Sequence, residues 1–473
     1  MILMKRFIRY MLFTAASISL AACGSDSNDE PGDKPSVTTT IRSVSVSNGS
    51  TIDPIDQILI DYNYSIAIDQ SKSATLNGTT VPASVNPQNG MQMILSVSTI
   101  FDTEYKLVVP AGMVYVKDNP SATYDAVNVT FRTTKPEEPV IVEIDNLTNP
   151  NATPEAKALY DELRTIYGKK IYSGAMGGVA WETGFTDYIS DNNNGAGYPK
   201  VIGFDYIHLP YSPSNWIDYG DITVIKDAWD QGSIPAITWH WRAPDSKSGE
   251  LDFYKDGTDF SASKALTAGT SENDFIESDI EKLAGYLKLV EDAGIPVLFR
   301  PFHEAAGDYT WGAWFWWGNE GVEVTKQMWN YLRDKLEKQY GLNNLIWVWT
   351  VQTSDQGKLA SLSLGKGAYP GNDVVDIIGT DLYPENILTD QTVQFNYVKN
   401  VADGHKMVAL TEVGNMVDFD KAAENDALWL YFMNWYDMDN SGKWAFNMWN
   451  YQKVGSYGNA WEAVMKNPLV INR

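Results

Sequence analysis

The segment RPFHEAAGDYTWGAWFWWG, from Arg300 to Gly318, places a carboxylic acid, Glu304, close to four tryptophans. A second acid, Glu412, ends another short apolar run, MVALTEVG. Two carboxylates that face one pocket can cleave a glycosidic bond: one donates a proton to the departing oxygen, and the other stabilises or attacks the sugar carbon. The aromatic surroundings of Glu304 predict a raised pKa and the proton-donor role, which leaves Glu412 as the nucleophile. Aromatic rings also stack on the apolar faces of sugars.

Other polar residues end neighbouring apolar runs, so spacing alone leaves a second acidic pair, Asp205 with Asp381, open as an alternative. Period-two alternation along a strand puts Arg300, Phe302 and Glu304 on one face, which predicts a guanidinium beside a carboxylate. The polar residues that end the runs are Asp205, His240, Glu304, Asp381 and Glu412.

The elements that must position these side chains are short apolar runs alternating with helical patterns, such as those over Asp274–Ala293 and Glu323–Tyr340. Eight such runs in residues 151–473 predict a (β/α)₈ TIM barrel, in which active sites lie at the C-terminal ends of the strands. A doubly wound sheet is the alternative, but the sequence has no glycine-rich phosphate loop and the strand count favours closure. The eight runs are KIYSGAM, KVIGFDYI, IPAITWHW, IPVLFRPFHE, LIWVWT, VDIIGTDLY, MVALTEVG and WAFNMWN.

Residues 37–135 show a different pattern, with short alternating strands separated by turn signals such as NGS, NGT and PQNG. This pattern predicts a small all-β sandwich that resembles bacterial Ig-like domains, joined to the barrel by a linker over residues 136–150. Its expected role is that of a spacer, with glycan binding as the alternative.

The N-terminus has the features of an export signal. Residues 1–22 carry three basic residues followed by an apolar run, and LAAC at residues 20–23 resembles a bacterial lipobox that would be lipidated at Cys23, the single cysteine of the chain. Residues 23–36 are too polar to fold and predict a tether. We therefore expect an outer-membrane lipoprotein exposed at the cell surface, or on the periplasmic face. A formal net charge of −24 argues against a nucleic-acid partner.

Four motifs resemble glycoside hydrolase family 26, whose best-known members are β-mannanases. They are RPFHE (300–304), WFWWG (314–318), GTDLYP (379–384) and LTEVG (410–414). The resemblance covers essentially the whole barrel. It implies that Glu304 is the acid/base and Glu412 the nucleophile of a retaining double displacement.

The resemblance also implies a contact between His303 and the sugar 2-hydroxyl. Arg300, Asp381 and Asp205 are expected to orient their neighbours by hydrogen bonding. The residues that the resemblance places around the sugar site are His240, Trp314, Tyr383 and Trp449.

The first hypothesis is therefore a retaining endo-β-1,4-mannanase acting on mannan, glucomannan or galactomannan. The alternatives are a hydrolase of the same family that cleaves β-1,3-xylan or mixed-linkage β-glucan, and a non-catalytic surface glycan-binding protein; endo or exo attack stays open. We expect no cofactor and no metal, because the helical zinc motif would need a histidine where Gly307 stands. A serine nucleophile lacks its GxSxG motif.

One loop departs from the compact family pattern, the insertion AAGDYTWGA from Ala305 to Ala313. Its Trp311 has no counterpart in compact members, and it either extends a binding subsite or caps the loop. His208, away from the motifs, is expected to be a hydrogen-bonded core residue.

Overall fold

The computed structural model describes residues 37–135, 143–355, 358–383, 391–446 and 457–473. The chain divides into two compact units, Met1–Val140 and Ile141–Arg473. Within the described residues, no helix combines the length and the apolar character needed to cross a membrane.

The described part of the first unit contains strands and no helix. Its strands form three sheets, with the orders β1-β3-β8-β7, β11-β10-β4 and β2-β12-β9-β5-β6. Alternate side chains of β12 are buried, so one face of this strand packs on the core and the other faces solvent. The strands are β1 (Ile41–Val44), β2 (Thr51–Ile52), β3 (Gln57–Tyr62), β4 (Ile66–Ile68), β5 (Ala74–Leu76), β6 (Thr79–Val81), β7 (Ala83–Val85), β8 (Gln92–Ser96), β9 (Glu104–Val109), β10 (Val114–Val116), β11 (Asn119–Thr123) and β12 (Val127–Thr133).

The second unit is built on a closed barrel of eight parallel strands, as the run pattern predicts. The barrel closes where Ala175 of its first strand pairs with Asn434 of its last. The strands in order are β14 (Gly174–Met176), β15 (Val201–Asp205), β16 (Ile234–Trp239), β19 (Val297–Pro301), β20 (Leu345–Thr350), β23 (Ile377–Leu382), β24 (Met407–Val413) and β25 (Phe432–Asn434). Smaller strands are β13 (Ile171–Tyr172) with β26 (Val470–Ile471), β17 (Ala243–Pro244) with β18 (Leu251–Asp252), and β21 (Ser354–Asp355) with β22 (Lys358–Leu359).

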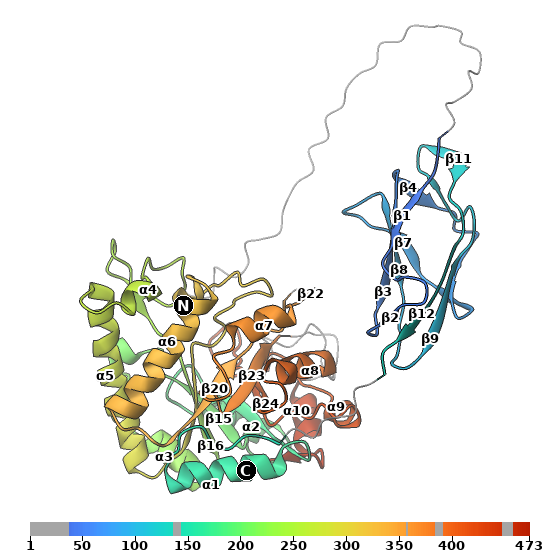
Figure 1. The fold of residues 1–473 in the computed structure, drawn as a ribbon. Helices are drawn as coiled ribbons and strands as arrows, with labels where there is room; N and C mark the ends of the chain where they lie inside the picture. The colour runs from blue at the N-terminus through green and yellow to red at the C-terminus, as the bar shows by residue number, and fades with distance from the viewer. Residues whose placement is uncertain (1–36, 136–142, 356–357, 384–390, 447–456) are drawn as a thin grey trace. The chain divides into compact units, whose positions relative to one another are not determined.

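Helices cover the outside of the barrel strands (Figure 1). The longest, α5, begins after Thr270, whose side chain accepts a hydrogen bond from the Asn273 amide. Its buried Ile276, Ile280 and Leu283 recur at helical spacing and face the core. The helices are α1 (Pro154–Ile166), α2 (Gly184–Asn192), α3 (Thr223–Asp230), α4 (Ala262–Ala265), α5 (Ser271–Asp292), α6 (Val322–Asp334) with a π-helical extension (Lys335–Gln339), α7 (Leu362–Ala368), α8 (Thr392–Val401), α9 (Phe419–Glu424) and α10 (Tyr457–Met465).

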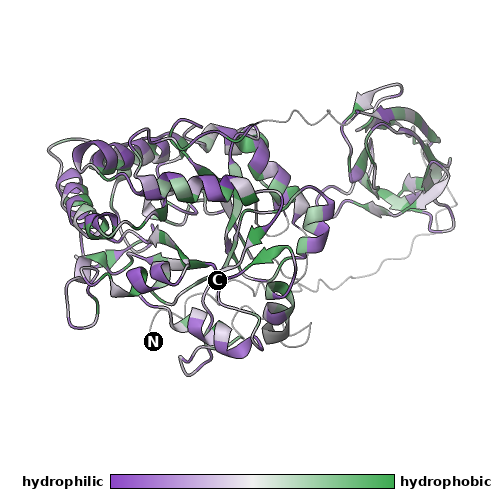
Figure 2. Cartoon of the chain, turned by 90° about the horizontal axis from the view of Figure 1, so that it is seen from below, coloured by the Kyte–Doolittle hydropathy of each residue, from purple (hydrophilic) through white to green (hydrophobic). Residues whose placement is uncertain are grey.

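Two apolar clusters hold the barrel together. One fills its interior with residues such as Leu298, Val348 and Met407, and the other lies between strands and helices, with Phe299 and Trp347 among its members. Adjacent residues of one strand therefore serve different cores, which explains why the barrel strands are apolar without interruption. Figure 2 shows hydrophobic strands inside and hydrophilic helix surfaces outside.

The eighth strand differs from the prediction. The sequence assigned it to WAFNMWN, residues 444–450, whereas the structure closes the barrel with Phe432–Asn434. Trp444 instead forms an isolated antiparallel bridge with Met438, and residues 447–450 lie outside the described part of the chain. The two apolar runs look alike in composition, and periodicity alone does not separate them.

Candidate active site

A buried guanidinium joins two carboxylates at the C-terminal ends of the barrel strands. Arg300, near the end of β19, donates from Nη1 to Asp381 Oδ2 at 2.8 Å and to Thr350 Oγ1 at 3.2 Å. Its Nη2 donates to Glu412 Oε1. All four residues are buried. Arg300 therefore lies beside carboxylates in the barrel interior, as the alternation predicts, and orients both of them.

Glu412 reaches this site through an irregularity in its strand. The pairing of β23 with β24 shifts register between Thr380 and Asp381, so that Asp381 lies opposite Glu412. Strict alternation would turn Glu412 outward with Leu410, which belongs to the apolar cluster between strands and helices, here called the outer cluster. The shift instead lets both Thr411, which donates to Asp381 Oδ1 at 2.6 Å, and Glu412 face the site. Such bulges re-aim side chains beside active sites.

A glycine makes room for this bulge. A side chain at Gly379 would bring its Cβ within 2.3 Å of Thr411 Cγ2, so the position accommodates no larger residue without rearrangement. The glycine of the GTDLYP motif therefore supports the arrangement of Asp381 and Glu412 rather than contacting a ligand.

Glu304 lies on a tight turn that follows β19. The strand ends at Pro301, and both Phe302 and Glu304 have left-handed backbone conformations, with φ of 54° and 48°. The predicted extension of the alternation from Arg300 through Phe302 to Glu304 is therefore wrong. Phe302 packs in the outer cluster, because the turn rotates the chain there. The same turn nevertheless brings Glu304 to the site, beside Asp381 and Glu412.

The separation of the acidic groups is short. One carboxylate oxygen from each of Glu304, Asp381 and Glu412 lies within 4.8 Å of the others. Carboxyl groups about 5–5.5 Å apart allow direct attack on the anomeric carbon, whereas inverting enzymes hold them about 6.5–9.5 Å apart. Oxygen ligands at this spacing could also hold a cation, but Arg300 already provides a positive charge to Asp381 and Glu412.

The two glutamates differ in what supports their charged forms. Burial, and then the charges of Glu412 and Asp381, raise the pKa of Glu304 well above its usual value, while Arg300 and a hydrogen bond from Trp314 oppose the rise. Burial and Asp381 raise the pKa of Glu412 to about 7, while Arg300 and Tyr383 limit it. Tyr383 donates to Glu412 Oε2 at 2.6 Å. Glu304 is thus the group that keeps its proton, in agreement with the predicted rise of its pKa.

Two histidines, His240 and His303, lie next to the turn that carries Glu304. His240 Nδ1 lies 2.5 Å from Asp205 Oδ2, and its Nε2 lies 3.1 Å from His303 Nε2. The Asp205 carboxylate accepts the Nδ1 proton of His240, and the Nε2 of that ring faces the Nε2 of His303. Burial, then His240 and Arg300, hold the pKa of His303 well below its usual value, so this ring is neutral. Asp205 therefore orients His240, as predicted.

The tryptophans of WFWWG have two different roles. Trp316 and Trp317 are buried, so they form part of the scaffold and offer no ring face to a sugar. Trp314 is 38% exposed and hydrogen bonds to Glu304. Of these three, Trp314 can serve as a stacking surface, and it is the tryptophan of the motif that the resemblance placed at the sugar site.

Three further residues singled out in the sequence, Trp311, Trp449 and His208, have different outcomes. Trp311 folds back and donates to the Gly318 carbonyl at 3.0 Å, which favours the cap alternative for the insertion. Trp449 lies outside the described residues. His208 is half-buried and packs 5.0 Å from Trp216, and its Nδ1 lacks a hydrogen-bond partner within the described chain. The prediction of a hydrogen-bonded core residue is therefore wrong for this ring nitrogen.

Tyr254 and Trp435 are aromatic residues near the site that were not predicted. The Glu304 charge contributes to raising the pKa of Tyr254 to about 12, after burial, which places this tyrosine beside the acid. Trp435 follows the eighth strand, and its ring lies 5.9 Å from His240. Correct assignment of the eighth strand would have identified Trp435, because residues that follow barrel strands lie at the active face. Tyr254 lies in a loop with no motif to mark it.

Comparison with known proteins agrees with this geometry. The model of Glycosyl hydrolase family 26 matches residues 148–463, and the chain belongs to this family. A mannan endo-1,4-beta-mannosidase of Thermothelomyces thermophilus is 29% identical over 93% of this chain and 94% of the relative. Mannan endo-1,4-beta-mannosidase B of a Piromyces species is 36% identical over 61% of this chain, which spans about half (48%) of that relative.

A solved structure shows the same fold. The GH26 domain of an endo-beta-mannanase/endo-beta-glucanase from Prevotella bryantii superposes with a TM-score of 0.59 and 35% identity. The match covers 69% of this chain and 97% of that chain.

Proposed function

We propose that this glycoside hydrolase is a retaining endo-β-1,4-mannanase. The observation that carries the proposal is the approach of Glu304 and Glu412 to within 4.8 Å of each other, with the proton retained on Glu304. The mannan endo-1,4-beta-mannosidases among its relatives support mannan as the substrate class.

The reaction follows from the environments of the two acids. Glu412, held by Arg300 and Tyr383, attacks the anomeric carbon and forms a glycosyl ester. The bond to the departing sugar breaks as Glu304 protonates its oxygen. Glu304, now a carboxylate, then removes a proton from water, whose oxygen displaces Glu412 at the same carbon. Two displacements retain the anomeric configuration and regenerate both acids.

The sugar at the cleaved bond is held by residues around this pair. We assign the stacking surface to the exposed ring of Trp314 and the hydroxyl contacts to His240 and Tyr383. His303 is buried and its Nε2 faces His240, so it supports that ring, and its contact with the sugar 2-hydroxyl stays a prediction of the resemblance. Trp449 remains a candidate for this site by resemblance to the family.

A product profile tests substrate and mode together. The protein is incubated with mannan, galactomannan, xylan and mixed-linkage glucan, and the products are separated over time. Internal cleavage of mannan gives oligosaccharides of several lengths and a rapid loss of viscosity. Release of a single disaccharide, or preferential cleavage of xylan or glucan, would contradict the proposal. Binding without products in the wild-type protein would favour a glycan-binding protein instead.

The same proposal includes the location of the enzyme. Lipidation of Cys23 would anchor it in the outer membrane, with residues 23–36 as a tether and the catalytic unit at the cell surface. A cell gains from cutting outside a polymer that it cannot import. Metabolic labelling with a fatty acid should mark the wild-type chain but not Cys23→Ala, and protease added to intact cells should degrade the enzyme. Equal labelling of both proteins would exclude the anchor.

The N-terminal unit fits the role of an Ig-like spacer. Its all-β composition and buried alternation over residues 41–133 support a sandwich, which would hold the catalytic unit away from the membrane. Removal of residues 37–135 should leave hydrolysis of soluble mannan unchanged. A loss of mannan binding in this deletion would instead favour a glycan-binding role.

A further inference from the structure

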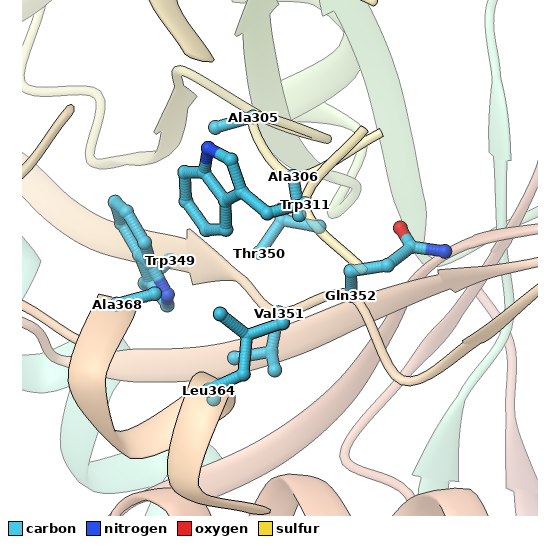
Figure 3. A pocket seen from close by; sticks show the side chains of 10 residues that line it. Ala305, Ala306, Trp311, Trp349, Thr350, Val351, Gln352, Leu364 and Ala368 are labelled. Atoms are coloured by element: carbon cyan, nitrogen blue, oxygen red, sulfur yellow. The ribbon is translucent and has the colours of Figure 1, made fainter. Parts of the chain in front are cut away.

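Trp311 packs against the turn that carries Glu304. Together with Ala305 and Ala306 of this turn, its ring lines a small cavity of about 20 Å³, whose other walls include Trp349 and Thr350. Figure 3 shows the indole between these two sets of residues. A volume of this size holds about one water molecule, so little room is left between the ring and the turn.

Hydrogen bonds and close packing connect Trp311 to the turn. Its indole N–H donates to the Gly318 carbonyl at 3.0 Å. The backbone of Gly318 lies so close to Ala305 that a Cβ at position 318 would come within 1.8 Å of the Ala305 carbonyl oxygen. Trp317, one residue earlier, donates its indole N–H to the His303 carbonyl at 3.0 Å. Trp317 and Gly318 thus contact His303 and Ala305, the two neighbours of Glu304 in the chain. Trp311 in turn fixes Gly318 through its hydrogen bond.

The turn needs such support. Two non-glycine residues, Phe302 and Glu304, have the left-handed conformation, which L-residues adopt only where the surroundings impose it. The same cavity wall contains Thr350, whose hydroxyl accepts a hydrogen bond from Arg300. Trp311 therefore lies between the turn that carries Glu304 and Thr350, which hydrogen bonds to Arg300. Arg300 in turn binds Glu412.

We infer that Trp311 is a positioning residue for Glu304, setting the proton donor at the distance from the departing oxygen that catalysis requires. This inference rests on the proposed acid/base role of Glu304. Trp311 touches no reacting atom and would act only through Glu304. Its substitution should therefore slow the substrates whose leaving group must be protonated more than those whose leaving group need not be. Cleavage between two sugars requires a proton on a poor leaving group, whereas release of an acidic phenol does not.

The test compares kcat/KM for mannooligosaccharides and for aryl β-mannosides with an acidic phenol, because this quantity reports the first displacement. Trp311→Ala should lower kcat/KM on mannooligosaccharides by about 10- to 100-fold, as expected for a misplaced catalytic group, and by about threefold or less on the aryl substrates. Trp311→Phe keeps one aromatic ring but loses the N–H donor and part of the indole volume. It should show the same preference with a smaller loss.

The matched control is Trp329→Phe. Trp329, on α6, is buried and also donates its indole N–H to a backbone carbonyl, that of Val374, at 3.1 Å. This variant should lower Tm without changing the ratio between the two substrates. A lower Tm with equal losses on both substrates in the Trp311 variants would overturn the inference, and so would unchanged kinetics.

Glu304→Ala separates the inference from the proposed function. A strong dependence on the leaving group in Glu304→Ala, but none in either Trp311 variant, overturns the inference and leaves the proposed function intact. No dependence on the leaving group in Glu304→Ala overturns the acid/base role itself, and the inference with it.

Discussion

The ends of β19 and β24 each deliver a glutamate to the same site, yet they do so in different ways. Glu412 belongs to a strand, and Arg300 and Tyr383 hydrogen bond to its two oxygens. Glu304 lies on a left-handed turn beyond its strand, and its side chain receives a hydrogen bond from Trp314. The first arrangement stabilises a carboxylate, and the second leaves a desolvated acid that prefers its proton.

The difference shows that position in the barrel does not decide the role of an acid. Both residues lie at the C-terminal ends of strands, where barrel enzymes place catalytic groups. The number of donors around each carboxylate separates the nucleophile from the proton donor. Substitution of Glu412, of Glu304 or of the groups that hydrogen bond to them should therefore change catalysis by different amounts and on different substrates.

The largest effect should come from Glu412→Ala. Without a nucleophile the covalent route is lost, so kcat should fall by about 10⁴-fold or more on every substrate, including aryl glycosides with an acidic phenol. Initial rates on mannan and on an aryl β-mannoside measure this. A variant with near-normal turnover would refute the assignment of the two acids.

Glu304→Ala should have a smaller and selective effect. Loss of a general acid costs about 10²- to 10⁴-fold on polysaccharide, but little in the first step with an acidic phenol as leaving group. Azide, which needs no general base, should restore turnover of the aryl substrate and give a β-mannosyl azide. Product analysis by NMR distinguishes this from an α-azide, which would indicate attack without a glycosyl-enzyme.

Much of this comparison could be predicted from the sequence. Eight apolar runs predicted the barrel, and the motifs around Glu304 and Glu412 predicted which acids to compare. Period-two reasoning placed Arg300 correctly because β19 is regular through that residue. It failed at Phe302, where the chain leaves the strand, and it would have turned Glu412 outward, because a single-residue register shift leaves no mark on the hydrophobic pattern.

The tryptophans show a second limit of sequence reasoning. Composition does not separate a ring that stacks on a ligand from one that supports a turn, because both are large and apolar. Trp316 and Trp317 are buried, and their indole N–H groups bond to the carbonyls of Trp241 and His303. The eighth strand was misplaced for a similar reason, since two aromatic runs occur near the C-terminus.

A moderate effect is expected from Tyr383→Phe. The lost hydroxyl donates to Glu412, and a hydrogen bond to a charged group contributes about 1.5–3 kcal/mol, so kcat/KM should fall by about 10- to 100-fold. Because this bond lowers the pKa of Glu412, its loss should raise that pKa and move the acidic limb of the pH profile to higher pH. An acidic limb that stays in place would mean that Tyr383 does not support the carboxylate.

The smallest expected effect is a shift in the pKa of Glu304 when Glu412 loses its charge. The Glu412 charge raises the pKa of Glu304, so Glu412→Gln, which removes this charge with little change of shape, should lower the pKa of Glu304 toward its usual value. The side-chain carbon signal of Glu304, followed by NMR as a function of pH, measures this shift. An unchanged pKa would show that the Glu412 charge does not contribute to it.

The most direct test of the account is to trap the glycosyl-enzyme. An activated 2-deoxy-2-fluoro mannooligosaccharide forms the ester and leaves it slowly, because the fluorine destabilises both positively charged transition states. Proteolysis and mass spectrometry should then find the sugar on the peptide that contains Glu412. A label on Glu304 or Asp381, or no label together with a product of inverted anomeric configuration, would contradict the account.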